Sequence, residues 1–405
     1  MSKGSYVIDA HPDASSNALP TAVEAMLRLD HPIKTKATRW AAEALATDDL
    51  IERDRRSEFW VEGWRRCADF GVQGATVDPA HGGRGMDTAE ALLLFEGLGY
   101  GSPDQGLVFG VACQTWAVIA ALEAGGSPEQ LQALLPGMCA GDIIGAFAMT
   151  ELESGSDTYA LSTTATEIDG GYRLDGRKAY VTLAPVADVV IVFATVDPAL
   201  GRWGITAFVV ETDRPGVDID LGREKMGLRT TPFGDVLLDG VEVPETAILG
   251  KVGSGGAIFN AAMESERAFL FALQLGQLER QLDDAVAYAR QRRQFGRPIG
   301  DFQAVAHRIA DMKARHEKAR LLLYKTALQR SLRQPASLSA ALTKLAATEG
   351  AIASGLDAVM IMGARGYLTE GGVERELRSA VGGAIYSGTS DIQRNIIARL
   401  LGVGA

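Results

Sequence analysis

The pattern of hydrophobic and polar positions divides the chain into three parts. From about Thr35 to Gly141, apolar residues recur at spacings of three and four, which is the period of helices with one buried face. Between about Ile143 and Leu249, short β-branched runs such as VVIVFAT (189–195) and ITAFVV (205–210) alternate with turns rich in Gly and Asp. From about Gly256 onward, long helical segments return. The predicted order is helical, then β, then helical.

Individual elements follow from the same pattern. In the first part we predict a helical stretch that ends at Gly71, a buried helix over residues 87–102, and a helix over residues 112–124 that stops at a Gly-Gly pair. In the last part, long helices near residues 257–292, 301–333, 335–362 and 389–401 indicate a helix bundle.

The predicted fold class is α+β and multidomain. Its parts are a flexible N-terminal arm (1–34), an N-terminal α-helical domain (35–142), a central β-barrel-like domain (143–250) and a C-terminal four-helix bundle (251–405). The arm is expected because the first 20 residues are polar and contain Pro and Gly.

Composition narrows the classes of function. The formal net charge of −11 argues against a broad nucleic-acid surface. Three scattered cysteines, Cys67, Cys113 and Cys139, fit a reducing cytoplasm better than a disulfide framework. His31, His81 and His307 are too dispersed to suggest a metal site. No apolar run without charges or breakers is expected to be long enough to span a bilayer, and the N-terminus lacks the apolar core of a signal peptide.

Five ordered motifs carry a resemblance. They are TELESGSD (150–157), GRKAYVT (176–182), KMGLR (225–229), RRQFG (292–296) and YSGTSDIQR (386–394). In this order and spacing the chain resembles the acyl-CoA dehydrogenase family over almost its whole length. The resemblance implies FAD as cofactor, a homodimer or homotetramer, and a flavin site completed across subunits.

The resemblance also implies which residues hold the flavin. Strand alternation in IGAFAMT points Phe147 and Met149 to one face. Thr150 would bond the polar edge of the ring, Tyr180 would wall one face, and Arg292 would reach the flavin of a neighbouring subunit. The full predicted set is Phe147, Met149, Thr150, Gly155, Ser156, Tyr180, Thr182, Arg292, Phe295, Gln303, Ala364, Thr389 and Asp391.

The catalytic base departs from the usual pattern. Most members carry a glutamate in the last motif where this chain has Ser387. A minority, typified by isovaleryl- and long-chain enzymes, carries it in a Glu-Arg pair on the first long helix of the last domain, and here that pair is Glu266-Arg267. Glu266 lies in an apolar stripe, where a carboxylate is costly unless paired or functional. We predict Glu266 as the base; the alternative is a buried ion pair with an arginine of a neighbouring helix.

The predicted reaction is α,β-dehydrogenation of an acyl thioester, carried by coenzyme A or by an acyl carrier protein, in a specialised secondary-metabolism enzyme. Electron-transfer flavoprotein or oxygen would accept the electrons. Predicted substrate contacts are Glu264, Arg267, Tyr386, Ser387 and Gly388. Two alternatives remain open: a flavin monooxygenase or oxidase on the same fold, and a non-catalytic binding homologue.

Overall fold

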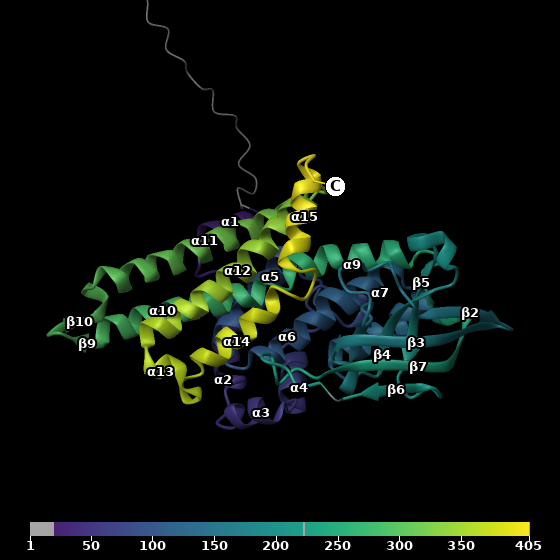
Figure 1. Ribbon diagram of the computed structural model, residues 1–405, viewed down its shortest axis with the longest axis horizontal. Coiled ribbons are helices and arrows are strands. Elements are labelled where there is room, and N and C mark those ends of the chain that lie inside the picture. Colours follow the sequence, from purple (N-terminus) through teal and green to yellow (C-terminus); the bar gives the residue numbers. More distant parts are fainter. Residues whose placement is uncertain (1–19, 222, 405) are drawn as a thin grey trace, which may run out of the picture.

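The computed structural model describes residues 20–221 and 223–404. The chain forms a helical N-terminal part, a β part and a helical C-terminal part (Figure 1). The N-terminal helices are α1 (Thr21–Leu27), α2 (Pro32–Ala44), α3 (Leu50–Arg56), α4 (Val61–Asp69), α5 (Thr88–Gly101), α6 (Gln105–Cys113), the π-helical segment η2 (Gln114–Ile119), α7 (Ala120–Gly125) and α8 (Pro128–Ala140).

The helical N-terminal part begins earlier than predicted. Residues 1–19 of the predicted arm (1–34) lie outside the described residues, but α1 and the start of α2 occupy much of residues 20–34. The stretch that ends at Gly71 is three helices, interrupted among others by the left-handed Ser57. The helix predicted over 112–124 starts at Gln105, behind the capping carboxylate of Asp104. Helix α6 is apolar on all sides, so its start shows no alternation of apolar and polar positions from which it could be predicted.

The strands of the central part form one eight-stranded sheet in the order β6-β7-β3-β2-β4-β5-β8, with β1 parallel to β4. The runs predicted at 189–195 and 205–210 are confirmed as β4 and β5. The strands are β1 (Gly145–Ala148), β2 (Thr164–Ile168), β3 (Gly171–Thr182), β4 (Val189–Thr195), β5 (Ile205–Glu211), β6 (Val217–Asp220), β7 (Phe233–Pro244) and β8 (Ile248–Leu249).

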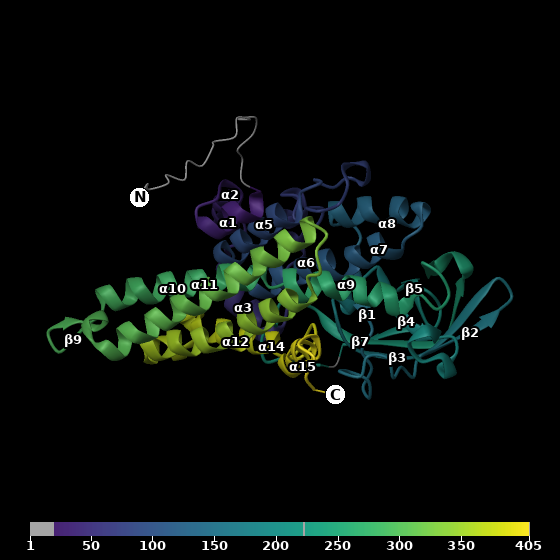
Figure 2. The ribbon, with the colours of Figure 1, turned by 90° about the horizontal axis from the view of Figure 1, so that it is seen from above.

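The C-terminal part is built on three long helices, α10, α11 and α12, which run side by side (Figures 1 and 2). A short hairpin, β9–β10, lies at their far tip, away from the sheet. The elements are α9 (Gly255–Phe269), α10 (Ala272–Gln291), β9 (Arg293–Gln294), β10 (Arg297–Pro298), α11 (Gln303–Ser331), α12 (Ser337–Met362), α13 (Ala364–Tyr367), α14 (Val373–Gly383) and α15 (Ser390–Leu400).

Two helix predictions in this part are wrong in detail. The helix predicted over 257–292 is broken between Phe269 and Ala272, although no Gly or Pro marks the break. Leu270 and Phe271 there are completely buried, so tertiary packing rather than local propensity decides the break. Helix α14 was not predicted; it begins after the left-handed Gly372.

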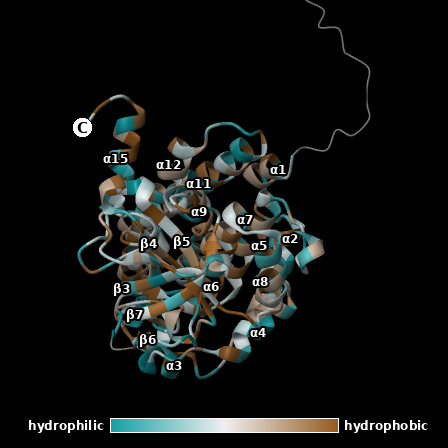
Figure 3. Cartoon of the chain, turned by 90° about the vertical axis from the view of Figure 1, so that its right-hand side faces the viewer, coloured by the Kyte–Doolittle hydropathy of each residue, from teal (hydrophilic) through white to brown (hydrophobic). Residues whose placement is uncertain are grey.

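Helix α5 joins the two helical parts. It packs against α2 on one side and α10 on the other, and its apolar neighbour α6 lies between it and the sheet (Figure 3). A Cβ at Gly99 would come within 1.8 Å of the Leu273 carbonyl oxygen, and a Cβ at Gly276 would come within 1.9 Å of the Glu96 backbone carbonyl oxygen. Glycine at both positions therefore permits the close crossing of α5 and α10.

A buried ionic cluster lies at the same crossing. Glu96 Oε1 forms an ion pair with Lys34 Nζ at 3.0 Å and accepts a hydrogen bond from Arg320 Nε at 2.8 Å, and Tyr324 donates to Oε2 at 2.5 Å. Burial opposes the charge of Glu96, but the two cations and the tyrosine hydroxyl lower its pKa to about 2. The cluster connects α2, α5, α10 and α11, since Lys34 also pairs with Glu279.

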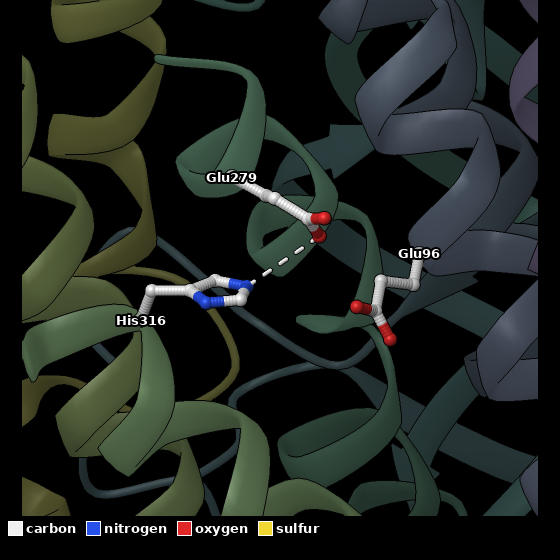
Figure 4. Close-up of side chains that lie close together, drawn as sticks. All are labelled: Glu96, Glu279 and His316. Carbon is white, nitrogen blue, oxygen red and sulfur yellow. Dashed lines mark ion pairs between the residues drawn. The ribbon is translucent and has the colours of Figure 1, made fainter. Parts of the chain in front are cut away.

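Glu96, Glu279 and His316 bring their ligand atoms within 4.8 Å of one another, as a metal site would (Figure 4). Lys34 and Arg320 already neutralise the two carboxylates. A divalent cation would leave excess positive charge in a buried place, which is costly. These residues are better described as a structural ionic cluster.

Two helical stretches, Gln105–Gly125 and Ser337–Met362, are long and apolar enough to cross a membrane by length and composition. Both contain charged residues, Glu123 in the first and Lys344, Glu349 and Asp357 in the second. Their apolar windows are 78% and 50% buried inside the fold, as in core helices.

Candidate active site

A cavity of about 940 Å³ lies where the three parts meet. Phe109, Cys113 and Ala117 line it from α6 and η2, at the spacing of four that places residues on one helix face. Met263 and Glu266 line it from α9. This part of the wall therefore combines apolar side chains with the carboxylate of Glu266.

The π-helical segment sets the position of the strand that opens the β part. Gln114 on η2 accepts a hydrogen bond at 2.8 Å from the backbone N–H of Gly145, the first residue of β1. Strand β1 then leads to Phe147 and Met149, which both line the cavity, as the alternation of IGAFAMT predicted. π-helical segments often occur at functional sites because they re-aim side chains within a helix.

Tyr180 lies on β3 in a conformation that side chains rarely adopt, with φ of +61°. A register shift between Lys178 and Val181 marks a β-bulge there. The Tyr180 N–H donates to Asp235 Oδ1 at 3.1 Å, and the residue, which lines the cavity, is 47% exposed. Strain at a functional site persists when the surroundings fix it, and Asp235 provides that support.

Asp235 is completely buried and also binds two arginines, Arg177 and Arg223. Burial opposes its charge, but hydrogen bonds from Arg223, the Tyr180 N–H and Arg177 lower its pKa to about 2. The Arg223 guanidinium in turn lies 4.6 Å from the centre of the Tyr180 ring. Asp235 thus holds Tyr180 through its backbone N–H, and Arg223 holds it through its ring.

The loop that begins at Thr150 is anchored by its second residue. Glu151 accepts from Lys178 Nζ at 2.7 Å and from the backbone N–H groups of Ser162 and Thr163. Burial opposes its charge, but Lys178 and these donors lower the pKa of Glu151 to about 2. The anchor fixes the loop whose Thr150, Gly155 and Ser156 line the cavity.

The side chains of Glu266 and Ser387 are in contact. Ser387 Oγ donates to Glu266 Oε1 at 2.6 Å, although 121 residues separate them. Burial raises the pKa of Glu266, while the Ser387 hydrogen bond and the Arg267 charge oppose that rise. Within residues 20–221 and 223–404 no ion pair to Glu266 is found, so the alternative of an arginine partner on a neighbouring helix is not realised.

The loop that carries Ser387 is held on both sides. Tyr386 packs between Phe109, with ring centroids 4.8 Å apart, and Phe271, at 5.8 Å. The Thr389 hydroxyl caps α15 by accepting from the Ile392 N–H. The break between α9 and α10 supplies Phe271, so this irregularity directly supports the active-site loop.

Most of the residues predicted from the sequence line the cavity. They are Phe147, Met149, Thr150, Gly155, Ser156, Tyr180, Thr182, Glu266, Arg267, Tyr386, Ser387, Gly388 and Thr389. The structure does not bring the others into this cavity within one chain: Arg292, Phe295, Gln303, Ala364, Asp391 and Glu264. Their roles remain predictions.

Several cavity residues were not predicted. Lys225 belongs to the quoted KMGLR motif, which was the available signal, but no role was drawn from it. The others carry no local signal, because a lone cysteine, aromatic or arginine on a helix usually belongs to a core or a surface. They include Phe109, Cys113, Phe233, Phe259, Arg378 and Arg399.

Comparison with known proteins identifies the family. The descriptions "Acyl-CoA dehydrogenase, N-terminal domain", "middle domain" and "C-terminal domain" match residues 30–142, 146–241 and 253–402. The chain belongs to the acyl-CoA dehydrogenase family. This confirms the predicted family and its three-part fold of helical, β and helical domains.

Three relatives within the family are similar to this chain over most of its length. An L-prolyl-(peptidyl-carrier protein) dehydrogenase of Pseudomonas fluorescens is 42% identical over 85% of this chain and 90% of that protein. The crystal structure of the prolyl acyl carrier protein oxidase AnaB has a TM-score of 0.90 and 41% identity over 92% of this chain and 98% of that chain. The structure of PigA with FAD and proline has a TM-score of 0.90 and 35% identity over 96% and 99%.

Proposed function

We propose that this enzyme is an FAD-dependent dehydrogenase that oxidises the α,β bond of a carrier-protein-bound aminoacyl thioester of the prolyl class. The observation that carries the proposal is Glu266, a buried carboxylate with raised pKa that lines the cavity and has no ion-pair partner among the described residues. The similar proteins named above, which act on prolyl carrier proteins, support the choice of substrate class.

The cavity fits a flavin by its size and by its chemistry. Hydroxyl groups of Thr150, Ser156 and Thr182 and the exposed ring of Tyr180 line one part of it. A flavin requires polar donors at its ring edge and a flat wall, and these side chains provide both. When bound, FAD supplies the two-electron acceptor for the hydride that leaves the β-carbon.

The protein's own residues perform the acid–base half of the reaction. Glu266 takes the proton from the α-carbon, and the electron pair of that C–H bond enters the new α,β double bond. The apolar wall, including Phe109 and Met263, excludes water from the carboxylate and so keeps it basic. Arg267, Tyr386 and Gly388 line the same cavity and would position the thioester.

The predicted flavin contacts outside this cavity support an assembly of two or four copies. Arg292, at the end of α10, and Phe295, in the β9–β10 hairpin, lie at the tip of the bundle away from the sheet (Figure 1), and Phe295 is 93% exposed. We place these residues, with Gln303 and Ala364, against the flavin of a second copy. We also place the enzyme in the cytoplasm, in keeping with its free thiols Cys67, Cys113 and Cys139.

The test is anaerobic mixing of the yellow holoenzyme with L-prolyl thioester on a phosphopantetheinylated carrier protein and, separately, with acyl-CoA thioesters. We expect the carrier-bound prolyl group to bleach the flavin without oxygen. Bleaching by acyl-CoA alone would contradict the carrier-protein substrate. Reduction only by NADH with a reductase, and oxygen incorporated into the product, would support a monooxygenase instead; a colourless protein that takes up no FAD would support a binding homologue. Reoxidation by electron-transfer flavoprotein or by oxygen then identifies the acceptor.

A further inference from the structure

We propose that Ser387 is a positioning residue for the base: its hydroxyl fixes one carboxylate oxygen of Glu266 and favours the ionised form, which leaves the other oxygen for the substrate proton. The inference rests on the proposed role of Glu266. It gives a role to position 387. By the resemblance described above, most members of the family carry the base itself at this position.

The two carboxylate oxygens of Glu266 differ in their surroundings. Oε1 accepts the Ser387 hydrogen bond at 2.6 Å. No hydrogen bond to Oε2 is found among the described residues, although the side chain lines the cavity. A carboxylate held at one oxygen keeps its plane fixed while the second oxygen stays available for a proton. Orientation of this kind contributes to catalysis because it removes the cost of aligning the base.

Ser387 is itself held firmly. Its φ of +55° is uncommon for a side-chain-bearing residue, and its side chain is nearly buried. Gln393 Nε2 donates to the backbone oxygen of Gly388 at 2.9 Å, and the ring of Tyr386 is packed between two other rings. A strained position with this much support is typical of residues whose orientation has a function.

Among the described residues, no charged group near Glu266 donates a hydrogen bond to it in place of Ser387. Arg267 on α9 has no hydrogen bond or ion pair among the described residues, and it acts on Glu266 only through its charge. Cys113 on α6 and Tyr386 in the loop have pKa values raised by burial and by the Glu266 charge, so they stay neutral. The remaining charged side chains that line the cavity are Glu151, Lys225, Arg378 and Arg399.

A hydroxyl that donates to a carboxylate favours the charged form, because the proton of the neutral acid weakens that hydrogen bond. Burial raises the pKa of Glu266, and the Ser387 hydrogen bond opposes the rise. Removal of the hydroxyl should therefore raise this pKa further. The base would then need a higher pH to be ionised.

The experiment is the pH profile of kcat/KM for the Ser387→Ala holoenzyme, measured with the thioester that bleaches the flavin best. Loss of a hydrogen bond to a charged carboxylate raises the pKa of that carboxylate by about one unit. We expect the acid limb of the profile to move to higher pH by about that amount. At pH values below the limb, kcat/KM of the variant is then about ten-fold lower than that of the wild type, and at high pH it returns to the wild-type plateau. Ser387→Gly should behave alike, since glycine accepts the positive φ and also lacks the hydroxyl.

Ser265→Ala is the matched control. Its hydroxyl lies one residue from the base but accepts from Arg330 Nη1 at 2.7 Å and makes no bond to Glu266, so its limb should not move. An unshifted limb in both Ser387 variants, whether the plateau is lowered or unchanged, overturns the inference. If instead Glu266→Gln retains full turnover, the proposed base itself is wrong, whatever Ser387 does.

Discussion

Glu266 satisfies two opposing physical demands at the level of a single residue. Burial keeps it basic, since desolvation raises the pKa of a carboxylate, yet it must be ionised to accept a proton. Its position on an apolar helix face could be predicted from the 4, 3, 4, 3 spacing of Phe259, Met263, Glu266, Leu270 and Leu273. Its partner could not, because Ser387 lies 121 residues away and nothing local connects the two.

Glu266→Gln should preserve the shape of the cavity and the hydrogen bond from Ser387 while removing the base. We expect the rate of anaerobic flavin reduction by substrate to fall by about 10²–10⁴-fold, the usual contribution of a general base. Stopped-flow absorbance of the flavin measures this rate. Glu349→Gln is the control, because Glu349 is exposed on α12 and pairs with Arg394 outside the cavity. A Glu266→Gln enzyme that reduces its flavin at the normal rate would refute the assignment.

Among the elements, the crossing of α5 and α10 determines where Glu266 lies relative to the N-terminal helices. The chain continues directly from α9, which carries Glu266, into α10. Helix α10 is held to α5 by the close approach at Gly99 and Gly276 and by the Glu96 ionic cluster. The sequence predicts α5 well, because its capping box at Asp87 and its apolar run are local signals. The break between α9 and α10 follows from packing alone.

Glu96→Gln should destabilise the fold because it leaves Lys34 and Arg320 buried without their shared anion. Breaking a buried ion pair in this way costs about 3–5 kcal/mol, and the urea midpoint followed by circular dichroism should fall accordingly. In the wild type the pKa of Glu96 is lowered to about 2, so its contribution is complete above the ordinary carboxyl pKa of 4.5 and is lost as the pH falls from there towards 2.

The variant should accordingly lose less stability on acidification over that range than the wild type does. Glu62→Gln, which breaks the exposed pair with Arg66, is the control and should change stability by less than about 1 kcal/mol. Equal midpoints for Glu96→Gln and the wild type would contradict the structural role of the cluster.

For the whole molecule, the arrangement of the three parts separates the predicted flavin contacts into two groups. One group lines the cavity, and Arg292, Phe295 and Gln303 lie near the tip of the α10–α11 hairpin (Figure 2). Asp391, at the start of α15, belongs to neither group. The motifs themselves do not distinguish the two groups, and only the family resemblance implied that one chain does not bring them together. An assembly of copies would reunite them.

Arg292→Ala should fold normally, because the side chain is exposed and no partner is found for it among the described residues. If it contacts the flavin of a second copy, the variant should lose FAD during gel filtration. The ratio of flavin to protein absorbance measures this loss, and added FAD should restore activity. The neighbouring Arg293→Ala is the control, since Arg293 donates to the Gly296 oxygen within its own hairpin. Full retention of FAD by Arg292→Ala would count against the shared site.

The sequence by itself determined the family, the order of the three parts, the central strands and a part of the cavity lining, including Glu266 and Tyr180. These features depend on local periodicity and on motifs that stay contiguous along the chain. Only the tertiary structure decided that Ser387 bonds Glu266, that Asp235 holds Tyr180, and that α9 and α10 separate at Phe271. The physical reason is that each of these depends on a contact or a burial between residues far apart in the chain, which no local pattern records.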